Sequence, residues 1–392
     1  MADTLPTTWP ADAHTLAKHA ILRRYLEAWF PILSRQASLL ARQSGKAADR
    51  EILFIDGFAG PGEYANGKEG SPVIALKAAL DHSTSFPVPV RMIFVEKRED
   101  RYGHLQAILA PHIARAAQSR NVRAVEPRHG DCDTELNAVL DEFGKKNICF
   151  GPALAFLDQF DYGAVSMQLI ARILKFGQCE VFSYLDYKDM NRWISDPNKA
   201  PAFTRAFGGE DWQGAKPLPE RERRQFLLEA YKSALKDPAR GGASYVVSFS
   251  MFDKDSQPLY WLIFSTNNLR GLEEMKRAMW SVDDTGEFRF SDEDGPDQLF
   301  LFRDRYGETW LAQELAAKLA GKTMTAAAVK EYVLVETPCY LFKGALKALE
   351  LGNPPRITVL KQPAGRKRGT YDDDQLQEIE IRFERSLFDF FA

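Results

Sequence analysis

The sequence has few cysteines, and their spacing excludes two kinds of site. Cys132, Cys149, Cys179 and Cys339 are spread over 392 residues without a C-x-x-C pair. A disulfide scaffold and a compact cysteine zinc site are therefore excluded. All six histidines precede residue 130 and none forms an H-x-x-x-H pair, so we expect no metal centre. This cysteine usage fits a reducing compartment, and we expect a cytoplasmic protein.

Long apolar runs and an excess of charge of one sign are also missing. No run of about 18 apolar residues occurs, so we predict no transmembrane helix and no membrane partner. The N-terminus lacks the basic start and apolar stretch of a signal peptide. The 51 basic and 54 acidic residues give a net charge of −3, so a nucleic-acid partner has to be judged from local patches. With 45 % hydrophobic and 27 % charged residues, the composition is that of an ordinary globular protein.

Residues 1–47 are predicted to form an N-terminal helical segment, in which a Pro- and Thr-containing leader over residues 1–13 precedes a helix from His14 to about Gln43. Apolar residues between Leu22 and Leu33 recur at three- and four-residue spacing, which is typical of a helix with one buried face. Lys18 lies on the other, polar side of this helix. Pro31 is expected to kink or split it.

Between residues 48 and 300, short apolar runs alternate with helical patterns five times. The strands are predicted over residues 52–55, 91–95, 122–126, 153–157 and 180–185. This alternation predicts an α/β domain with a doubly wound, parallel sheet. A helical insertion is expected at about residues 189–240, followed by a possible hairpin of strands 244–251 and 259–265.

The pattern changes in residues 301–392. Three short helices are predicted there, over residues 309–320, 325–334 and 341–349, and two strands follow, over residues 357–360 and 379–383. This order is the plan of a winged-helix module. We therefore expect a C-terminal winged-helix-like domain.

The polar loop between these last two strands is basic. Residues 361–371 contain Lys361, Arg366, Lys367 and Arg368 and no acidic residue. Such a loop suits a wing that follows a phosphate backbone. Three aspartates come next, so a solvated turn or a protein-docking surface is the alternative.

Polar side chains end the first four predicted strands. Asp56 opens the glycine-rich loop of residues 56–62, Glu96 ends the second strand, and Asp131 and Asp158 follow the third and fourth. Glycines let a backbone approach a ligand closely, and a carboxylate at the end of the second strand can accept ribose hydroxyls. Ligands of open α/β sheets bind at the carboxyl ends of the strands, so the four aligned positions predict a nucleoside site. For each carboxylate alone, a helix cap or a solvated strand end is the alternative.

This order of acids resembles class I S-adenosylmethionine-dependent methyltransferases rather than the G-x-G-x-x-G dinucleotide loop. The resemblance implies S-adenosylmethionine as the cofactor and a Rossmann-like methyltransferase sheet. The residues that it implies are Asp56, Phe58, Gly60 and Gly62 for the methionine moiety, Glu96 for the ribose and Asp131 for the adenine. It also implies that Asp158 accepts a hydrogen bond from a target amine and that Phe160 stacks on a flipped base. The alternative for Asp158 is a structural cap.

Three stretches are similar to a narrower family, the three-Cys-motif partner proteins. They are residues 14–26, residues 54–62 with Gly70-Ser71-Pro72, and residues 275–280. The resemblance implies a partner protein with a three-cysteine, radical-type motif. Gln159 stands where the family tends to have proline.

Together these observations predict a methyltransferase acting on a nucleic acid, DNA or RNA, or on a nucleotide, with a role in DNA modification or repair. A catalytically silent nucleic-acid-binding protein of the same fold is the first alternative. A methyltransferase of small molecules or proteins is the second.

Overall fold

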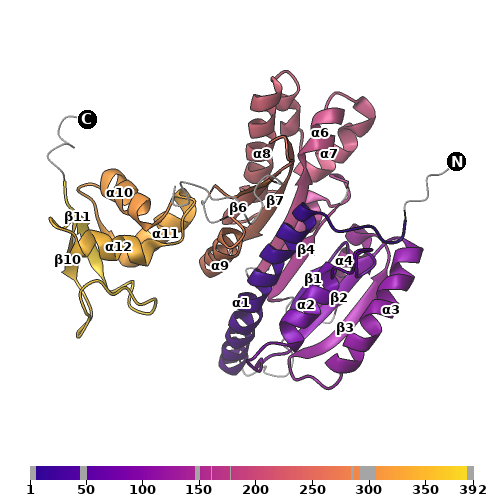
Figure 1. Ribbon diagram of the computed structural model, residues 1–392, viewed down its shortest axis with the longest axis horizontal. Coiled ribbons are helices and arrows are strands. Elements are labelled where there is room, and N and C mark those ends of the chain that lie inside the picture. The colour runs from indigo at the N-terminus through magenta and orange to yellow at the C-terminus, as the bar shows by residue number, and fades with distance from the viewer. Residues whose placement is uncertain are drawn as a thin grey trace. The chain divides into compact units, whose positions relative to one another are not determined.

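The computed structural model of the chain describes residues 6–44, 51–145, 151–159, 161–176, 178–283, 287–291 and 306–385. The chain divides into two units, residues 1–278 with 290–295, and residues 279–289 with 296–392 (Figure 1). Among the residues described, no helix combines the length and the apolar character that crossing a membrane requires.

The first unit is built on an eight-stranded sheet with the order β3-β2-β1-β4-β5-β7-β6-β8. The strands are β1 (Ile52–Asp56), β2 (Val90–Glu96), β3 (Val122–His129), β4 (Ala153–Leu157), β5 (Cys179–Asp186), β6 (Tyr245–Phe252), β7 (Pro258–Thr266) and β8 (Arg289–Ser291). β1 to β5 pair in parallel, which confirms the predicted parallel sheet. β7 is antiparallel to both β5 and β6, so the predicted hairpin extends the same sheet.

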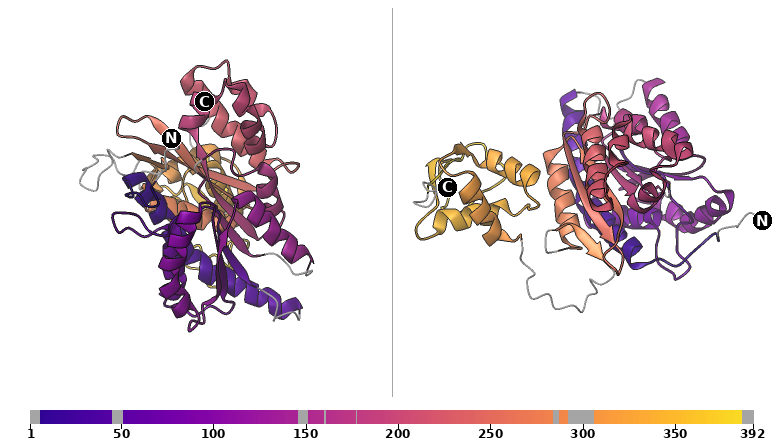
Figure 2. Two further views of the ribbon diagram at one scale, coloured as in Figure 1. Left: turned by 90° about the vertical axis from the view of Figure 1, so that its right-hand side faces the viewer. Right: turned by 90° about the horizontal axis from the view of Figure 1, so that it is seen from above.

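Helices cover both faces of this sheet (Figure 2). Those outside the insertion are α1 (Ala13–Ser44), α2 (Ser71–Leu80), α3 (Glu99–Ala116), α4 (Cys132–Lys145), α5 (Met167–Leu174) and α9 (Leu269–Trp280). The insertion after β5 holds α6 (Tyr187–Trp193), α7 (Ala200–Phe207), α8 (Glu220–Lys236) and two short helical turns.

The two faces of the sheet bury different side chains. Odd-numbered residues such as Leu53 and Ile55 form one core with α4, α5 and the insertion helices. Even-numbered residues carry a row of aromatic rings that includes Phe54, and α1 covers this row, with the rings of Phe30 and Phe54 6.5 Å apart. β1 and β4 are buried along their whole length, which explains why both are continuous apolar runs in the sequence.

α1 crosses the even-numbered face as a continuous helix, and Pro31 lies inside it without splitting it. The Tyr25 hydroxyl and the Trp29 indole donate hydrogen bonds of 2.5 and 2.7 Å to the buried carboxylate of Glu180 on β5. Near the amino ends of the strands, the Ser34 hydroxyl donates to a backbone carbonyl just before β2. The middle and the C-terminal half of α1 are therefore fixed to the sheet.

The second unit has its own apolar core. Its elements are α10 (Glu308–Lys318), β9 (Thr323–Thr325), α11 (Ala326–Glu336), α12 (Phe342–Leu351), β10 (Ile357–Lys361) and β11 (Glu380–Phe383). The strands form an antiparallel sheet in the order β10-β11-β9. The three predicted helices and two predicted strands are present, and β9 is a strand that the sequence pattern did not predict. The hydroxyl of Thr325 caps α11, accepting a 3.2 Å hydrogen bond from the Ala328 amide.

Candidate functional site

The carboxyl ends of the parallel strands bring the predicted acids to one edge of the first unit's sheet. Asp56 pairs in register with Phe94 on β2 and with Phe156 on β4. Glu96 and Asp158 each lie two residues further along their own strand direction. Because side chains two residues apart point to the same face, Asp56, Glu96 and Asp158 share the even-numbered face that α1 covers.

The loop after β1 has the backbone that a close ligand approach requires. Gly60 and Gly62 have φ values of 62° and 87°, in the left-handed region that glycine adopts most readily. A Cβ atom on Gly60 would meet, within 4 Å, only the outer ring edge of Trp9. The loop therefore presents an open backbone surface under Trp9.

Asp56 is fully buried and only half satisfied. One carboxylate oxygen accepts a 3.1 Å hydrogen bond from the Phe58 amide, and the other, Oδ2, has no partner among the described residues. Burial raises the pKa of Asp56 from 3.8 to about 7, although Ser71 and the Phe58 amide oppose the rise. The carboxylate of Asp158 raises this pKa further and the ammonium of Lys18 lowers it, so the three groups act on one another. An orphaned buried acceptor of this kind suits a cationic donor.

The side chain of Glu96 is fixed at the end of β2. It is 7 % exposed, and one of its oxygens accepts a 2.6 Å hydrogen bond from the Arg98 amide. This bond fixes the carboxylate at the turn into α3 and leaves further acceptor positions. The geometry suits two vicinal hydroxyls.

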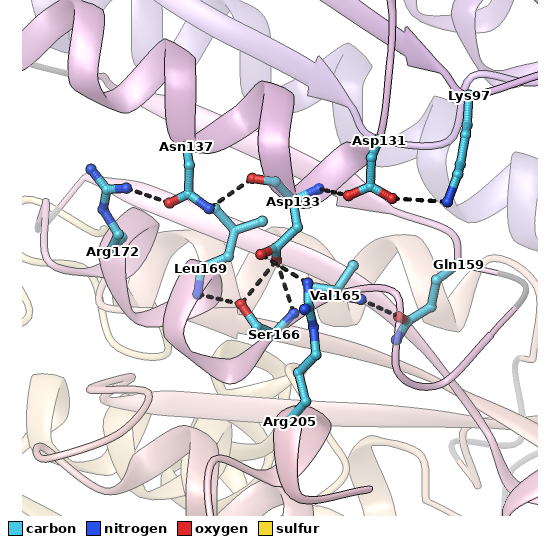
Figure 3. Close-up of polar contacts among 10 residues, drawn as sticks. All are labelled: Lys97, Asp131, Asp133, Asn137, Gln159, Val165, Ser166, Leu169, Arg172 and Arg205. Carbon is cyan, nitrogen blue, oxygen red and sulfur yellow. Dashed lines mark hydrogen bonds and ion pairs between the residues drawn. The ribbon is translucent and has the colours of Figure 1, made fainter. Parts of the chain in front are cut away.

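Asp131 lies at the more exposed rim of this edge (Figure 3). It accepts a 3.2 Å hydrogen bond from the Asp133 amide and lies 3.3 Å from the Lys97 ammonium. The first contact fixes the turn into α4. Beside it, the ring of His129 stacks on Tyr102 with the centroids 5.0 Å apart, which forms a flat surface at the end of β3.

Asp158 forms a buried ion pair with Lys18 of α1. Lys18 is only 7 % exposed, so its expected position on the outer side of the helix was wrong. The first turns of α1 pass over the strand ends, where Ala17, Lys18 and His19 are buried, whereas Leu16 and Ala20 remain exposed. Phe160, the predicted stacking residue, lies outside the described residues.

The side chain of Gln159 is buried, and its amide oxygen points toward Val165 (Figure 3). Its amide nitrogen donates a 2.9 Å hydrogen bond to the Tyr184 carbonyl, and its oxygen accepts one of 2.9 Å from the Val165 amide. Ser166 then caps α5 and is bound in turn by Asp133. Gln159 thus fixes the loop that carries Asp158.

Three aromatic rings, those of Tyr184, Tyr260 and His14, lie beside Asp158, and the sequence did not reveal them. We call this group the aromatic wall. Tyr184 is next to Asp158 on the neighbouring strand, and its ring lies 4.4 Å from that of Tyr260, centroid to centroid. His14, one turn before Lys18, reaches the same group, with its ring 6.3 Å from that of Tyr260. Burial raises the pKa of Tyr184, and Asp158 contributes to this rise. These rings provide a surface on which a planar group can stack.

Residues 6–12 form a strap over the glycine-rich loop. The carbonyl of Trp9 accepts a 2.9 Å hydrogen bond from the Ala65 amide, and the Asn66 side chain exchanges two hydrogen bonds with the backbone of Ala11. The Arg101 guanidinium lies 4.4 Å from the Trp9 ring centroid. The strap is therefore tied to both sides of the surface above the glycines.

In the second unit, two of the four basic residues of the predicted loop bind within the unit and stabilise the loop itself. Arg366, whose side chain is 1 % exposed, forms a 2.6 Å ion pair with Glu350. Arg368 donates a 2.6 Å hydrogen bond to the carbonyl of the same residue. Lys361 and Lys367 are exposed. The local charge available to a phosphate is therefore smaller than the sequence suggests.

No family model matches the chain, and no curated protein matches it. Solved structures do resemble it. An O-methyltransferase from Bacillus cereus in complex with S-adenosylhomocysteine has 15 % identity and a TM-score of 0.30, covering 66 % of this chain and 92 % of that one. A SAM-dependent methyltransferase from Geobacter sulfurreducens in complex with S-adenosylhomocysteine has 12 % identity and a TM-score of 0.26, covering 58 % and 88 %. These TM-scores and identities are too low to support a conclusion about function. The description of the fold depends on the strand order and pairing given above. Within the described residues, no cluster of three or more His, Cys, Asp or Glu side chains could hold a metal ion.

Proposed function

We propose that the first unit binds S-adenosylmethionine and transfers its methyl group. The observation that carries this proposal is the buried Asp56 oxygen that has no hydrogen-bond partner among the described residues, next to a loop whose backbone is open at Gly60. Glu96 on the neighbouring strand adds a second buried acceptor. A large, mostly parallel sheet with helices on both faces is the setting of a Rossmann-like methyltransferase.

Each acid has a role that its surroundings suit. Asp56 accepts from the ammonium group of the cofactor, Glu96 from the ribose hydroxyls, and Asp131 from the adenine amine. When bound, S-adenosylmethionine supplies a methyl group activated by its sulfonium. The open backbone surface over Gly60 accommodates the chain between amino acid and ribose.

The acceptor side of the proposed site is formed by Asp158 and the aromatic wall. The neighbouring rings of Tyr184 and Tyr260 favour an acceptor that can stack on an aromatic ring, and we propose a nucleic acid or a nucleotide. We further propose that the chain belongs to the three-Cys-motif partner family and acts with a radical-type partner protein. We also propose that the second unit acts as a winged-helix domain. The topology of the second unit and the exposed Lys361 and Lys367 support a nucleic-acid contact there.

One observation favours a second candidate, a catalytically silent binding protein. The Oδ2 atom of Asp158 is already paired with the ammonium of Lys18, so part of the accepting capacity that a target amine would need is taken up within the protein. Methyl transfer that is lost in Asp158→Ala would refute the silent alternative.

Titration calorimetry with S-adenosylhomocysteine tests cofactor binding directly. We expect the wild type to bind and Glu96→Ala to bind at least about tenfold more weakly, because two charge-assisted hydrogen bonds are lost. Glu229→Ala, an exposed change on α8, is the matched control and should bind like the wild type. A wild-type protein that does not bind, or equal binding by Glu96→Ala, would overturn the assignment.

A further inference from the structure

Lys18 keeps hydrogen-bonding capacity that the protein does not use. An ammonium group has three donors, and within the described part of the chain the only hydrogen-bond partner of Lys18 is Asp158. The residue is 7 % exposed, so solvent has little access to the remaining donors. Buried donors without partners are costly, which points to a missing acceptor.

The ion pair is not needed to hold α1 in place. The helix is already fixed by the two hydrogen bonds to Glu180, by Phe30 and by Ser34. A buried ion pair contributes little to stability compared with apolar residues of the same size. A lysine at this position therefore calls for a reason other than packing.

Asp56 has an unused hydrogen-bond acceptor, whereas Lys18 has unused donors. The Oδ2 atom of Asp56 is a buried acceptor that has no hydrogen-bond partner in the described part of the chain, and its charge interacts with that of Lys18. Spare donors on one residue and a spare acceptor on the other fit a ligand that carries both a carboxylate and an ammonium. The α-amino-acid end of S-adenosylmethionine has this chemistry.

We infer that Lys18 binds the carboxylate of the cofactor's amino-acid end while Asp56 binds its ammonium, so that the two residues form a clamp for a zwitterion. This inference rests on the proposed function. It assigns the N-terminal helix α1 to the cofactor site, where the sequence placed only residues of the strand ends and of the glycine-rich loop. Lys18 keeps its contact with Asp158 and thereby links the cofactor side to the acceptor side.

Two ligands separate the clamp from the rest of the site. S-adenosylhomocysteine has the amino-acid end, whereas 5′-methylthioadenosine has the same adenosine and thioether but no amino acid. Calorimetry with both ligands is carried out on the wild type, Lys18→Met, Lys18→Arg and Lys254→Met. Lys254 is an exposed residue in the turn between β6 and β7 and serves as the matched control.

We expect Lys18→Met to weaken S-adenosylhomocysteine binding by roughly tenfold to a hundredfold, as for a hydrogen bond to a charged group. Its affinity for 5′-methylthioadenosine should stay within about twofold of the wild type, which also shows that the variant is folded. Lys18→Arg keeps the charge and should lose less, and Lys254→Met should match the wild type for both ligands.

Two results would overturn the clamp while leaving the cofactor site intact. One is wild-type affinity of Lys18→Met for S-adenosylhomocysteine, and the other is an equal loss for both ligands, which would mean that Lys18 only shapes the site. A wild type that binds neither ligand refutes the proposed function itself, and the inference with it.

Discussion

The unusual carboxyl group of Asp56 predicts that cofactor affinity depends on pH. Burial raises its pKa from 3.8 to about 7, so the group is about one-tenth ionised at pH 6 and about nine-tenths ionised at pH 8. Only the ionised form attracts an ammonium group. The affinity for S-adenosylhomocysteine should therefore rise about tenfold from pH 6 to pH 8.

Calorimetric titrations at about pH 6, 7 and 8 measure this rise. Asp56→Asn should bind more weakly and without the tenfold change, and any titration of the ligand's own amine remains visible in this variant. 5′-Methylthioadenosine, which lacks the ammonium, should bind equally at each pH. The reasoning is refuted if the wild type and Asp56→Asn show the same pH dependence.

The same raised pKa has the opposite effect on the stability of the ligand-free protein. Because the folded pKa lies above the unfolded one, the contribution is complete below about pH 4 and is lost as the pH rises through about 7. Relative to Asp56→Asn, the free energy of unfolding should fall by about 4 kcal/mol over this range. Affinity that rises while stability falls identifies one group as the source of both effects.

Three further changes test other parts of the structure. Burial raises the pKa of Glu180 from 4.5 to about 6. In urea titrations, the free energy of unfolding of the wild type relative to Glu180→Gln should therefore fall by about 2 kcal/mol between about pH 4 and pH 7. A difference between the two proteins that does not change with pH would contradict this. Trp9→Ala removes the Arg101 contact of the strap, so S-adenosylhomocysteine should dissociate about tenfold faster in stopped-flow measurements; an unchanged rate would show that the strap does not retain the ligand. Arg366→Ala leaves a buried carboxylate unpaired and should destabilise the second unit by about 3–5 kcal/mol in thermal unfolding, whereas the exposed Lys367→Ala should cost less than about 0.5 kcal/mol.

The sheet was predictable because its signals are local. Five apolar runs alternate with helical patterns, and this alone specifies parallel strands with crossover helices. The positions of Asp56, Glu96 and Asp158 at the strand ends follow from the same pattern. The pairing of β7 between β5 and β6 was not predictable, because a hairpin in the sequence does not specify which of its strands meets the sheet.

The rest of the site depends on contacts between distant segments. Helical periodicity places a lysine on the solvent side, and nothing near Lys18 in the sequence indicates that this side of the helix is buried over the strand ends. Gln159 stabilises its own loop through a hydrogen bond to Tyr184, a residue of the next strand. Likewise, the basic loop looked free because its partner Glu350 lies 16 residues before Arg366.

α1 also has a consequence for the order in which the protein folds. Its contacts with Asp158 and Glu180 join residues 140 and 155 positions apart in the chain. Such separations raise the contact order, and the loops must close before these contacts form. The glycine-rich loop and the strands that flank it can assemble earlier from nearer neighbours. We therefore expect Lys18 to reach the site late in folding. A fragment that ends before β5 would keep the four acids and Lys18 but lack Glu180, the buried carboxylate that holds the middle of α1.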